Sequence, residues 1–121
     1  MIIGIGVDIL EKNRIKKILI KYKIKFLKKI LNKKELSILT NNITPIEFIS
    51  KKFTIKETIS KVLGTGFRNK LTFNKININN NNLGKPKNII FQNIRLFITI
   101  SHEKNITISI TIIIKTKNQQ T

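Results

Sequence analysis

The acidic residues of this chain are few enough to be examined one by one. Six carboxylates stand against 24 lysines and arginines. Asp8 ends a row of small residues in an apolar segment, and Glu57 lies mid-way along a helical segment that also carries Lys61. Two carboxylates from separate elements suit a Mg²⁺ ion completed by substrate phosphates and water, with lysines to neutralise phosphate charge. The alternative is structural ion pairing, because Glu57 and Lys61 also have i,i+4 spacing, worth about 0.2–0.5 kcal/mol.

The helical segment that carries Glu57 is expected to span residues 45–63. Thr44, Pro45 and Glu47 form a capping-box pattern at its start, and Gly64 suits the left-handed position after its last turn. A broad apolar arc is expected to face the core, opposite a polar strip of Glu47, Ser50, Lys51, Thr54, Glu57, Thr58 and Lys61. Lys52 and Lys56 fall inside the apolar arc, where a charge is costly unless it reaches water or meets an anion.

The first ten residues, MIIGIGVDIL, predict a buried strand. One face would carry Ile3, Ile5, Val7 and Ile9, and the other only Gly4, Gly6 and Asp8. The glycine row indicates that something approaches this face closely. A dinucleotide-binding loop is not favoured, since no third glycine follows at the required spacing and Asp8 would repel a phosphate.

Residues 11–31 predict a basic amphipathic helix, with a possible break near Lys23. Its basic positions include Arg14, Lys17 and Lys21. They indicate either a solvated face enlarged by the lysine-rich composition, or a surface that docks an acidic partner or a membrane. A second short helix, capped by Asn32, is expected to end near residue 39.

After residue 66 the pattern changes from helical spacing to alternation. Strands are expected at residues 71–73, 75–78, 89–91, 96–100 and 106–112, the last of them half-buried and antiparallel. The expected fold class is α+β, in which the N-terminal strand, the basic helices and one long central helix pack on a mostly antiparallel sheet. Residues 1–121 are expected to form one domain.

The net charge of +18 would ordinarily suggest a polyanionic partner. We discount it, because the excess of Ile, Lys and Asn is typical of AT-rich coding pressure. A small basic nucleic-acid-binding protein remains the alternative, although Phe26, Phe48 and Phe53 fall on apolar helical faces and not on a basic sheet. With no Cys and one His, thiol catalysis, Cys-based zinc sites and His-rich metal sites are excluded. No signal peptide or membrane insertion is expected, so a cytoplasmic protein is predicted.

Four sequence pieces occur in a fixed order along the chain. They are GIGVDI at 4–9 with Arg14-Ile15 behind it, FTIKETISKVLGTG at 53–66, Gly84-Lys85-Pro86, and Ser101-His102. Together they resemble the holo-[acyl-carrier-protein] synthases, a family of 4′-phosphopantetheinyl transferases, over nearly the whole chain. That family transfers 4′-phosphopantetheine from coenzyme A to a serine of apo acyl carrier protein with Mg²⁺, releases adenosine 3′,5′-bisphosphate and serves fatty acid biosynthesis.

The resemblance implies a role for each matching position. Asp8 and Glu57 would be metal ligands, and Glu57 and Lys61 would be catalytic, Lys61 by stabilising phosphoryl charge. The serine proton would go to a metal-associated water or to Glu57. The residues expected to contact coenzyme A are Lys52, Lys61, Gly64, Thr65, Gly66, Gly84, Lys85, Pro86 and His102. For His102 a turn histidine that caps local backbone is the alternative.

The resemblance also implies two kinds of protein contact. Arg14, Lys17 and Lys21 match the basic helix on which this family docks the acidic helix of acyl carrier protein. The family is commonly a homotrimer with sites between neighbouring subunits. A remnant that keeps only the docking surface is a third possibility.

Three departures from the family pattern bear on these expectations. Thr58 and Val62 stand where alanine is usual, a mild packing change, and Lys70 stands where glycine is frequent. Between Pro86 and Ser101 the chain is too short for the helix usually carried there. These departures bear on trimerisation and the nucleotide pocket and leave the metal-site residues unchanged.

Overall fold

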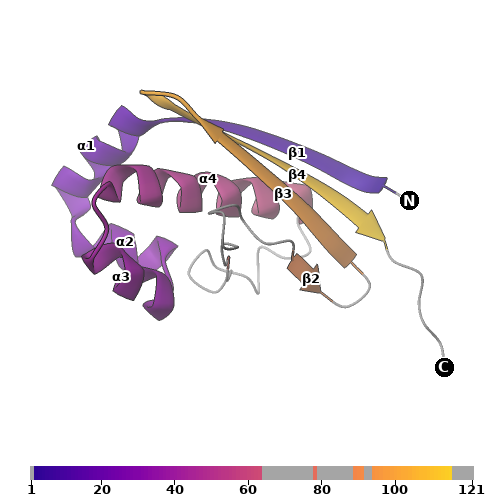
Figure 1. Cartoon of the computed structure of the whole chain (residues 1–121), viewed down its shortest axis with the longest axis horizontal. Helices are drawn as coiled ribbons and strands as arrows, with labels where there is room; N and C mark the ends of the chain where they lie inside the picture. The colour runs from indigo at the N-terminus through magenta and orange to yellow at the C-terminus, as the bar shows by residue number, and fades with distance from the viewer. Residues whose placement is uncertain (1, 64–77, 79–88, 92–93, 116–121) are drawn as a thin grey trace.

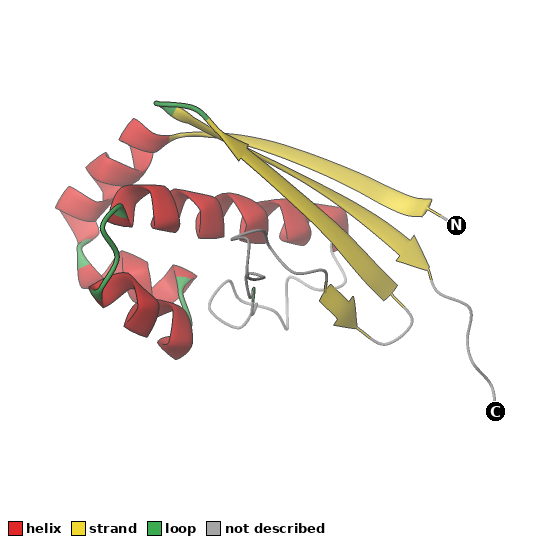
Figure 2. Cartoon of the chain, in the orientation of Figure 1, coloured by secondary structure: helices red, strands yellow, loops and turns green. Residues whose placement is uncertain are grey.

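The structure, a computed structural model, describes residues 2–63, 78, 89–91 and 94–115. Its elements, coloured by type in Figure 2, are β1 (Ile2–Glu11), α1 (Lys12–Tyr22), α2 (Ile24–Ile30), α3 (Lys33–Thr40), α4 (Pro45–Leu63), β2 (Ile89–Phe91), β3 (Ile94–His102) and β4 (Ile106–Lys115). The α+β class is confirmed. The strands expected at 71–73 and 75–78 lie outside the described residues, apart from Ile78.

The strands form one sheet in the order β1-β4-β3-β2, with antiparallel pairing throughout. Asp8 on β1 stands opposite Ser109 on β4, which stands opposite Ile100 on β3. Helix α4 runs along one face of this sheet, while α1, α2 and α3 gather around the end where α4 begins (Figure 1). β2 pairs directly with β3, in agreement with a segment too short for an additional helix.

Helix α4 approaches β1 over its two glycines. A methyl group added at Gly4 would lie 3.5 Å from Val62 Cγ1, and one at Gly6 would lie 3.2 Å from Thr58 Cγ2 and overlap Val62 Cγ2. The close approach indicated by the glycine row is therefore that of α4. Side chains larger than the family's usual alanine fit at Thr58 and Val62 because the facing strand presents no side chains there.

The sheet faces are distributed differently from the expectation for β1. Toward α4 lie the small and polar residues Thr107, Ser109 and Thr111, all fully buried. The opposite face carries Ile5, Val7 and Ile9, whose exposures are 62%, 53% and 61%. The prediction of a buried strand is therefore wrong for one face of β1, since no element of the described chain covers these side chains.

The helix boundaries follow local sequence signals closely. The expected break is confirmed at Lys23, whose φ of 48° separates α1 from α2. Asn32 caps α3 in a reciprocal capping box with Glu35. At the start of α4 the expected capping box is replaced, because the Thr44 N–H donates to Asn42 Oδ1 and Glu47 points to other partners.

Two apolar clusters hold α4 in place. One lies between α4 and the sheet, and its buried members are Ile55, Ile59, Ile78, Leu96, Ile98 and Ile113. The other joins the end of β1 to the helices, and its buried members are Leu10, Ile15, Ile30, Leu31 and Ile49. The predicted polar strip of α4 is wrong in part, since Ser50, Thr54 and Thr58 are fully buried. Thr54 and Thr58 bond back to the carbonyls of Ser50 and Thr54.

Candidate active site

The two carboxylates singled out in the sequence meet between β1 and α4. The side chain of Asp8 lies near enough to Glu57 to raise the pKa of the Glu57 carboxyl. Lys61, one turn further along α4, donates from Nζ to Asp8 Oδ1 at 3.0 Å. The side chain of Asp8 is 13% exposed and that of Lys61 is 54% exposed, so the cluster opens to solvent on the lysine side. The structure thus brings together Asp8, Glu57 and Lys61, and the cross-element contact argues against a simple Glu57–Lys61 pair.

The electrostatics of this cluster reflect two acids held close together. Burial raises the pKa of Glu57, and the hydrogen bond and negative charge of Asp8 raise that pKa further. Lys61 and Arg14 oppose the shift with their positive charges. The pKa of Lys61 is itself raised, chiefly because it donates a hydrogen bond to Asp8.

The donor set fits a hard divalent cation. Two adjacent carboxylates supply the oxygen ligands that Mg²⁺ prefers, and they leave most of its coordination shell to water and substrate oxygens. Their mutual repulsion is the kind that such a cation relieves. Within the part of the chain that the structure describes, no group of three or more acidic, His or Cys side chains could form a fuller protein cage.

Lys52 and Lys56 lie inside the molecule, on a different side of α4 from the Asp8 cluster. Lys52 Nζ donates to the backbone carbonyl of Ile78 at 2.8 Å, and Lys56 Nζ donates to Glu35 Oε1 and to the carbonyl of Ile30. Burial lowers the pKa of both lysines, and the nearby Glu35 partly offsets this. In the described chain the buried Lys52 faces protein groups, so its position does not support the expected contact with coenzyme A.

His102 lies at the end of β3, where its Nε2 is 2.9 Å from Glu47 Oε1 at the start of α4. Burial acts to raise the pKa of Glu47, but the hydrogen bond from Lys51 and the positive charges of Lys51, His102 and Lys12 leave it lowered. His102 therefore bonds across elements and does not cap its local turn.

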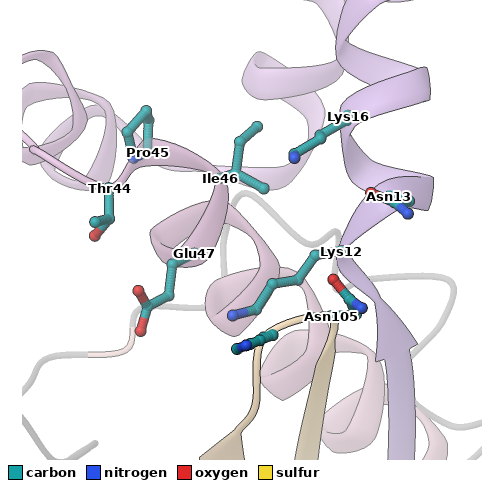
Figure 3. A pocket seen from close by; sticks show the side chains of 9 residues that line it. Lys12, Asn13, Lys16, Thr44, Pro45, Ile46, Glu47 and Asn105 are labelled. Carbon is teal, nitrogen blue, oxygen red and sulfur yellow. The ribbon is translucent and has the colours of Figure 1, made fainter.

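A pocket of about 320 Å³ lies beside this pair, lined by Lys12, Asn13, Lys16, Thr44, Pro45, Ile46, Glu47, Lys104 and Asn105. Figure 3 shows residues from the starts of α1 and α4 on its two sides, with Lys12 extending toward Glu47. Asp8 and Glu57 are not among its lining residues, so it is separate from the carboxylate cluster.

The expected docking residues share one exposed surface. Arg14, Lys17 and Lys21 are all exposed on α1, at spacings of three and four residues that place them on one helical face. The positive charge of Arg14 also opposes the rise in the pKa of Glu57.

Some expected site residues lie outside the described residues, namely Gly64, Thr65, Gly66, Gly84, Lys85 and Pro86. Sequence reasoning missed two carboxylates that the structure shows to be engaged. Glu35 carries the contacts of Lys56, and Glu47 carries that of His102. The Asn32–Glu35 capping pattern was a usable signal for the first, whereas nothing local indicated the partner of the second.

Comparison with known proteins identifies the family of the chain. The family model described as "4'-phosphopantetheinyl transferase superfamily" matches residues 4–112. The holo-[acyl-carrier-protein] synthase of Buchnera aphidicola subsp. Schizaphis graminum is 50% identical over 86 residues, which are 71% of this chain and 68% of that protein. The enzyme of the same name from Blochmanniella floridana is 46% identical over 86 residues, covering 71% of this chain and 69% of that protein.

Solved structures that resemble this chain belong to the same family. The holo-(acyl-carrier-protein) synthase of Bacillus anthracis str. Ames, in complex with CoA (3',5'-ADP), has a TM-score of 0.83 and 33% identity, covering 97% of this chain and 99% of that one. The synthase from Neisseria meningitidis has a TM-score of 0.86 and 30% identity, covering 95% and 100%. The expected family is thereby confirmed: the chain belongs to the 4′-phosphopantetheinyl transferase superfamily and is a phosphopantetheinyl transferase of the holo-[acyl-carrier-protein] synthase type.

Proposed function

We propose that this protein transfers 4′-phosphopantetheine from coenzyme A to a serine of apo acyl carrier protein, with Mg²⁺, as one domain over residues 1–121. The observation that carries the proposal is the contact between Asp8 and Glu57 with Lys61 beside them. Synthases of this fold from Bacillus anthracis and Helicobacter pylori are complexed with CoA, which supports coenzyme A as the donor. A nucleic-acid-binding role is not favoured, because family and fold both point to a transferase.

Asp8 and Glu57 would hold the Mg²⁺ ion. When bound, that ion supplies Lewis-acid stabilisation of phosphate charge. Lys61 is the exposed cation of the cluster and would meet the oxygens of the coenzyme A pyrophosphate, where charge grows on the leaving phosphate. Its partner Asp8 keeps the Lys61 ammonium protonated, as the raised pKa of Lys61 requires.

The transfer makes one bond and breaks one. The serine oxygen forms a bond to the phosphorus that carries phosphopantetheine, and the bond from that phosphorus to the bridging pyrophosphate oxygen breaks, releasing adenosine 3′,5′-bisphosphate. The serine proton passes to Glu57 or to a water beside it.

The carrier protein would dock on the exposed face of α1. Arg14, Lys17 and Lys21 would attract an acidic helix, and the positive charge of Arg14, which acts on the pKa of Glu57, supports this choice of face. We propose the same residues as the acyl carrier protein surface and fatty acid biosynthesis as the role served. A cytoplasmic location agrees with this role, and no helix among the described residues is long and apolar enough to cross a membrane.

We propose a homotrimer because the face of the sheet opposite α4 is apolar and exposed. Ile5, Val7 and Ile9 on β1, together with Ile106 and Ile110 on β4, remain exposed, whereas the polar side of β4 faces the core. Association of three copies through this face would remove its apolar surface from water. His102 would then be available to a neighbouring subunit. We propose Lys61 and His102, together with Gly64, Thr65, Gly66, Gly84, Lys85 and Pro86, as the contacts for coenzyme A.

The direct test is the mass of apo acyl carrier protein after incubation with the protein, coenzyme A and Mg²⁺. We expect a gain equal to one phosphopantetheine group with the unaltered protein and none with Glu57→Gln, although that variant remains folded by circular dichroism. No mass gain with folded unaltered protein would favour a remnant that retains only the docking surface. Unchanged turnover by Glu57→Gln would remove Glu57 from the site.

A further inference from the structure

A second charged cluster lies inside the molecule, beneath α4, and the transfer mechanism above does not use it. Lys56 is completely buried, and Nζ of Lys56 donates to Glu35 Oε1 at 2.5 Å and to the backbone carbonyl of Ile30 at 2.7 Å. Glu35 is 2% exposed and belongs to α3, whereas Ile30 is the last residue of α2. One lysine of α4 is therefore tied to two other helices.

Glu35 is the centre of this cluster. Besides Lys56, its Oε1 accepts from the backbone N–H of Asn32 at 3.0 Å, while Asn32 Oδ1 accepts from the Glu35 N–H at 2.8 Å. Its Oε2 lies 4.0 Å from Lys52 Nζ. The capping box of α3 thus fixes the Glu35 side chain independently of Lys56. Glu35 is therefore a rigid partner for the Lys56 ammonium.

The position of Lys56 next to Glu57 in sequence makes this contact relevant to the site. Successive residues of an α-helix are about 100° apart around its axis, so any rotation of α4 that releases Lys56 turns Glu57 by the same angle. The opposite side of α4 contacts β1 through Thr58 and Val62 over Gly6. That contact limits how near α4 comes to the strand, whereas the bonds of Lys56 limit how α4 is turned.

We propose that Glu35 is a positioning residue for phosphopantetheine transfer, because by holding Lys56 it fixes the rotation of α4 at which Glu57 meets Asp8. The inference rests on the proposed function of Asp8 and Glu57 as the metal-binding pair. Glu35 itself contacts neither substrate nor metal. Substitution of a residue that orients a metal ligand without touching the metal typically lowers metal affinity by about 10- to 100-fold.

The test compares Glu35→Gln with the unaltered protein by Mn²⁺ binding, followed by electron paramagnetic resonance in the presence of coenzyme A. Gln can keep the capping box with Asn32 but leaves the buried Lys56 ammonium without its counter-charge. We expect Mn²⁺ affinity to fall by about tenfold or more and kcat to fall, while the KM for acyl carrier protein stays unchanged because the α1 surface is intact.

Two further variants separate positioning from general stability. Leu96→Ala trims the apolar cluster between α4 and the sheet but leaves the bonds of Lys56 intact, so it serves as the control for a comparable loss in Tm through weaker packing of α4. We expect this control to keep its Mn²⁺ affinity within about twofold. Glu35→Gln/Lys56→Met removes both charges, so it should regain Tm relative to Glu35→Gln without regaining Mn²⁺ affinity, because Met cannot bond to residues 30 and 35.

The possible results are distinct. Wild-type Mn²⁺ affinity in Glu35→Gln, or an equal loss in Leu96→Ala at equal Tm, would overturn the positioning role while leaving the transferase function standing. A third outcome is that Glu35→Gln weakens Mn²⁺ binding although even the unaltered protein transfers no phosphopantetheine. That outcome would support the role of Glu35 in positioning Glu57 and would contradict the proposed function. Absence of Mn²⁺ binding by the unaltered protein would overturn both.

Discussion

At the scale of single residues, the central feature is the pair of carboxylates, Asp8 and Glu57, which the fold holds close together although their negative charges repel each other. Burial and Asp8 both raise the pKa of Glu57, which means that the folded protein binds a proton at Glu57 more tightly than the unfolded chain does. The favourable contribution is complete below the unfolded-state pKa, about 4.5, and is lost as the pH rises through the folded-state pKa. At neutral pH the ionised pair therefore costs stability unless a cation is bound, as expected where a site is built for binding and not for stability.

This cost predicts opposite effects of Glu57→Gln on stability and on activity. In metal-free buffer at neutral pH we expect the variant to have a Tm equal to or above that of the unaltered protein, and the difference should shrink as the pH is lowered toward 4.5. Mg²⁺ should raise the Tm of the unaltered protein and not that of the variant, because only the native pair binds the ion. Differential scanning calorimetry over a pH series measures both effects. A variant with lower Tm at every pH would show that the Asp8–Glu57 contact is stabilising.

At the scale of elements, the site depends on how closely α4 approaches β1. Gly6 faces Thr58 and Val62 with no room for a methyl group beside Val62. The same strand carries Asp8 two residues later, and the same helix carries Glu57 and Lys61. Strand and helix must therefore pack at short range for the site residues to meet, and the glycine row is the feature of the sequence that permits it.

Gly6→Ala is expected to destabilise the protein by about 1–3 kcal/mol, because the new methyl group forces α4 away from β1. Transfer activity should fall as well, since Glu57 moves with the helix. The double variant Gly6→Ala/Val62→Ala removes the overlapping methyl groups and should recover most of both losses. Urea denaturation and the mass assay provide the measurements. If Val62→Ala fails to rescue Gly6→Ala, the close contact at Val62 is not what limits the approach.

The basic face of α1 belongs to the same scale. Charge reversal by Lys17→Glu/Lys21→Glu should raise the KM for acyl carrier protein and reduce its dependence on salt, because steering by opposite charge is screened by ions. These two positions are preferable to Arg14, whose charge also acts on Glu57. Lys33→Glu/Lys34→Glu on α3 changes the net charge equally, at exposed positions away from α1. Equal effects of the two double variants would indicate a net-charge effect and not a docking surface.

At the scale of the whole molecule, the sheet has its faces arranged in an unusual way. The hydroxyls of Thr107, Ser109 and Thr111 are buried and, among the described residues, have no hydrogen-bond partner, while isoleucines occupy the outer face. An isolated subunit with this arrangement buries the less apolar side of β4. Burial of the outer face would remove its isoleucines from water, which is why we connect this arrangement with the proposed trimer.

Val7→Asp is expected to convert the proposed trimer to a monomer, because it places a charge in the middle of the exposed apolar face. Size-exclusion chromatography with light scattering gives the molecular mass directly. Ile43→Asp is the matched control, since Ile43 is 95% exposed in the segment before α4 and far along the chain from the sheet. A monomeric unaltered protein, or a trimeric Val7→Asp variant, would contradict assembly through this face.

The sequence by itself determined most of the local structure and singled out the acids of the candidate site. Helical spacing located α3, α4 and the basic segment that divides at Lys23 into α1 and α2, alternation located β1 and β4, and the motifs around Asp8 and Glu57 identified two acids that the structure brings together. These features depend on neighbours along the chain, so local patterns are sufficient to predict them.

Only the tertiary structure decided which side of each element is covered. Alternation shows that Ile5, Val7 and Ile9 share a face, but it cannot tell whether that face or the glycine face packs on α4. In this protein the glycine face does, because a row without side chains allows the closest packing. Likewise, Lys56 stood in the apolar arc without an evident partner, and Glu35, distant in sequence, supplied it. A buried charge is explained by the group that it meets in space, and such a group has no fixed distance along the chain.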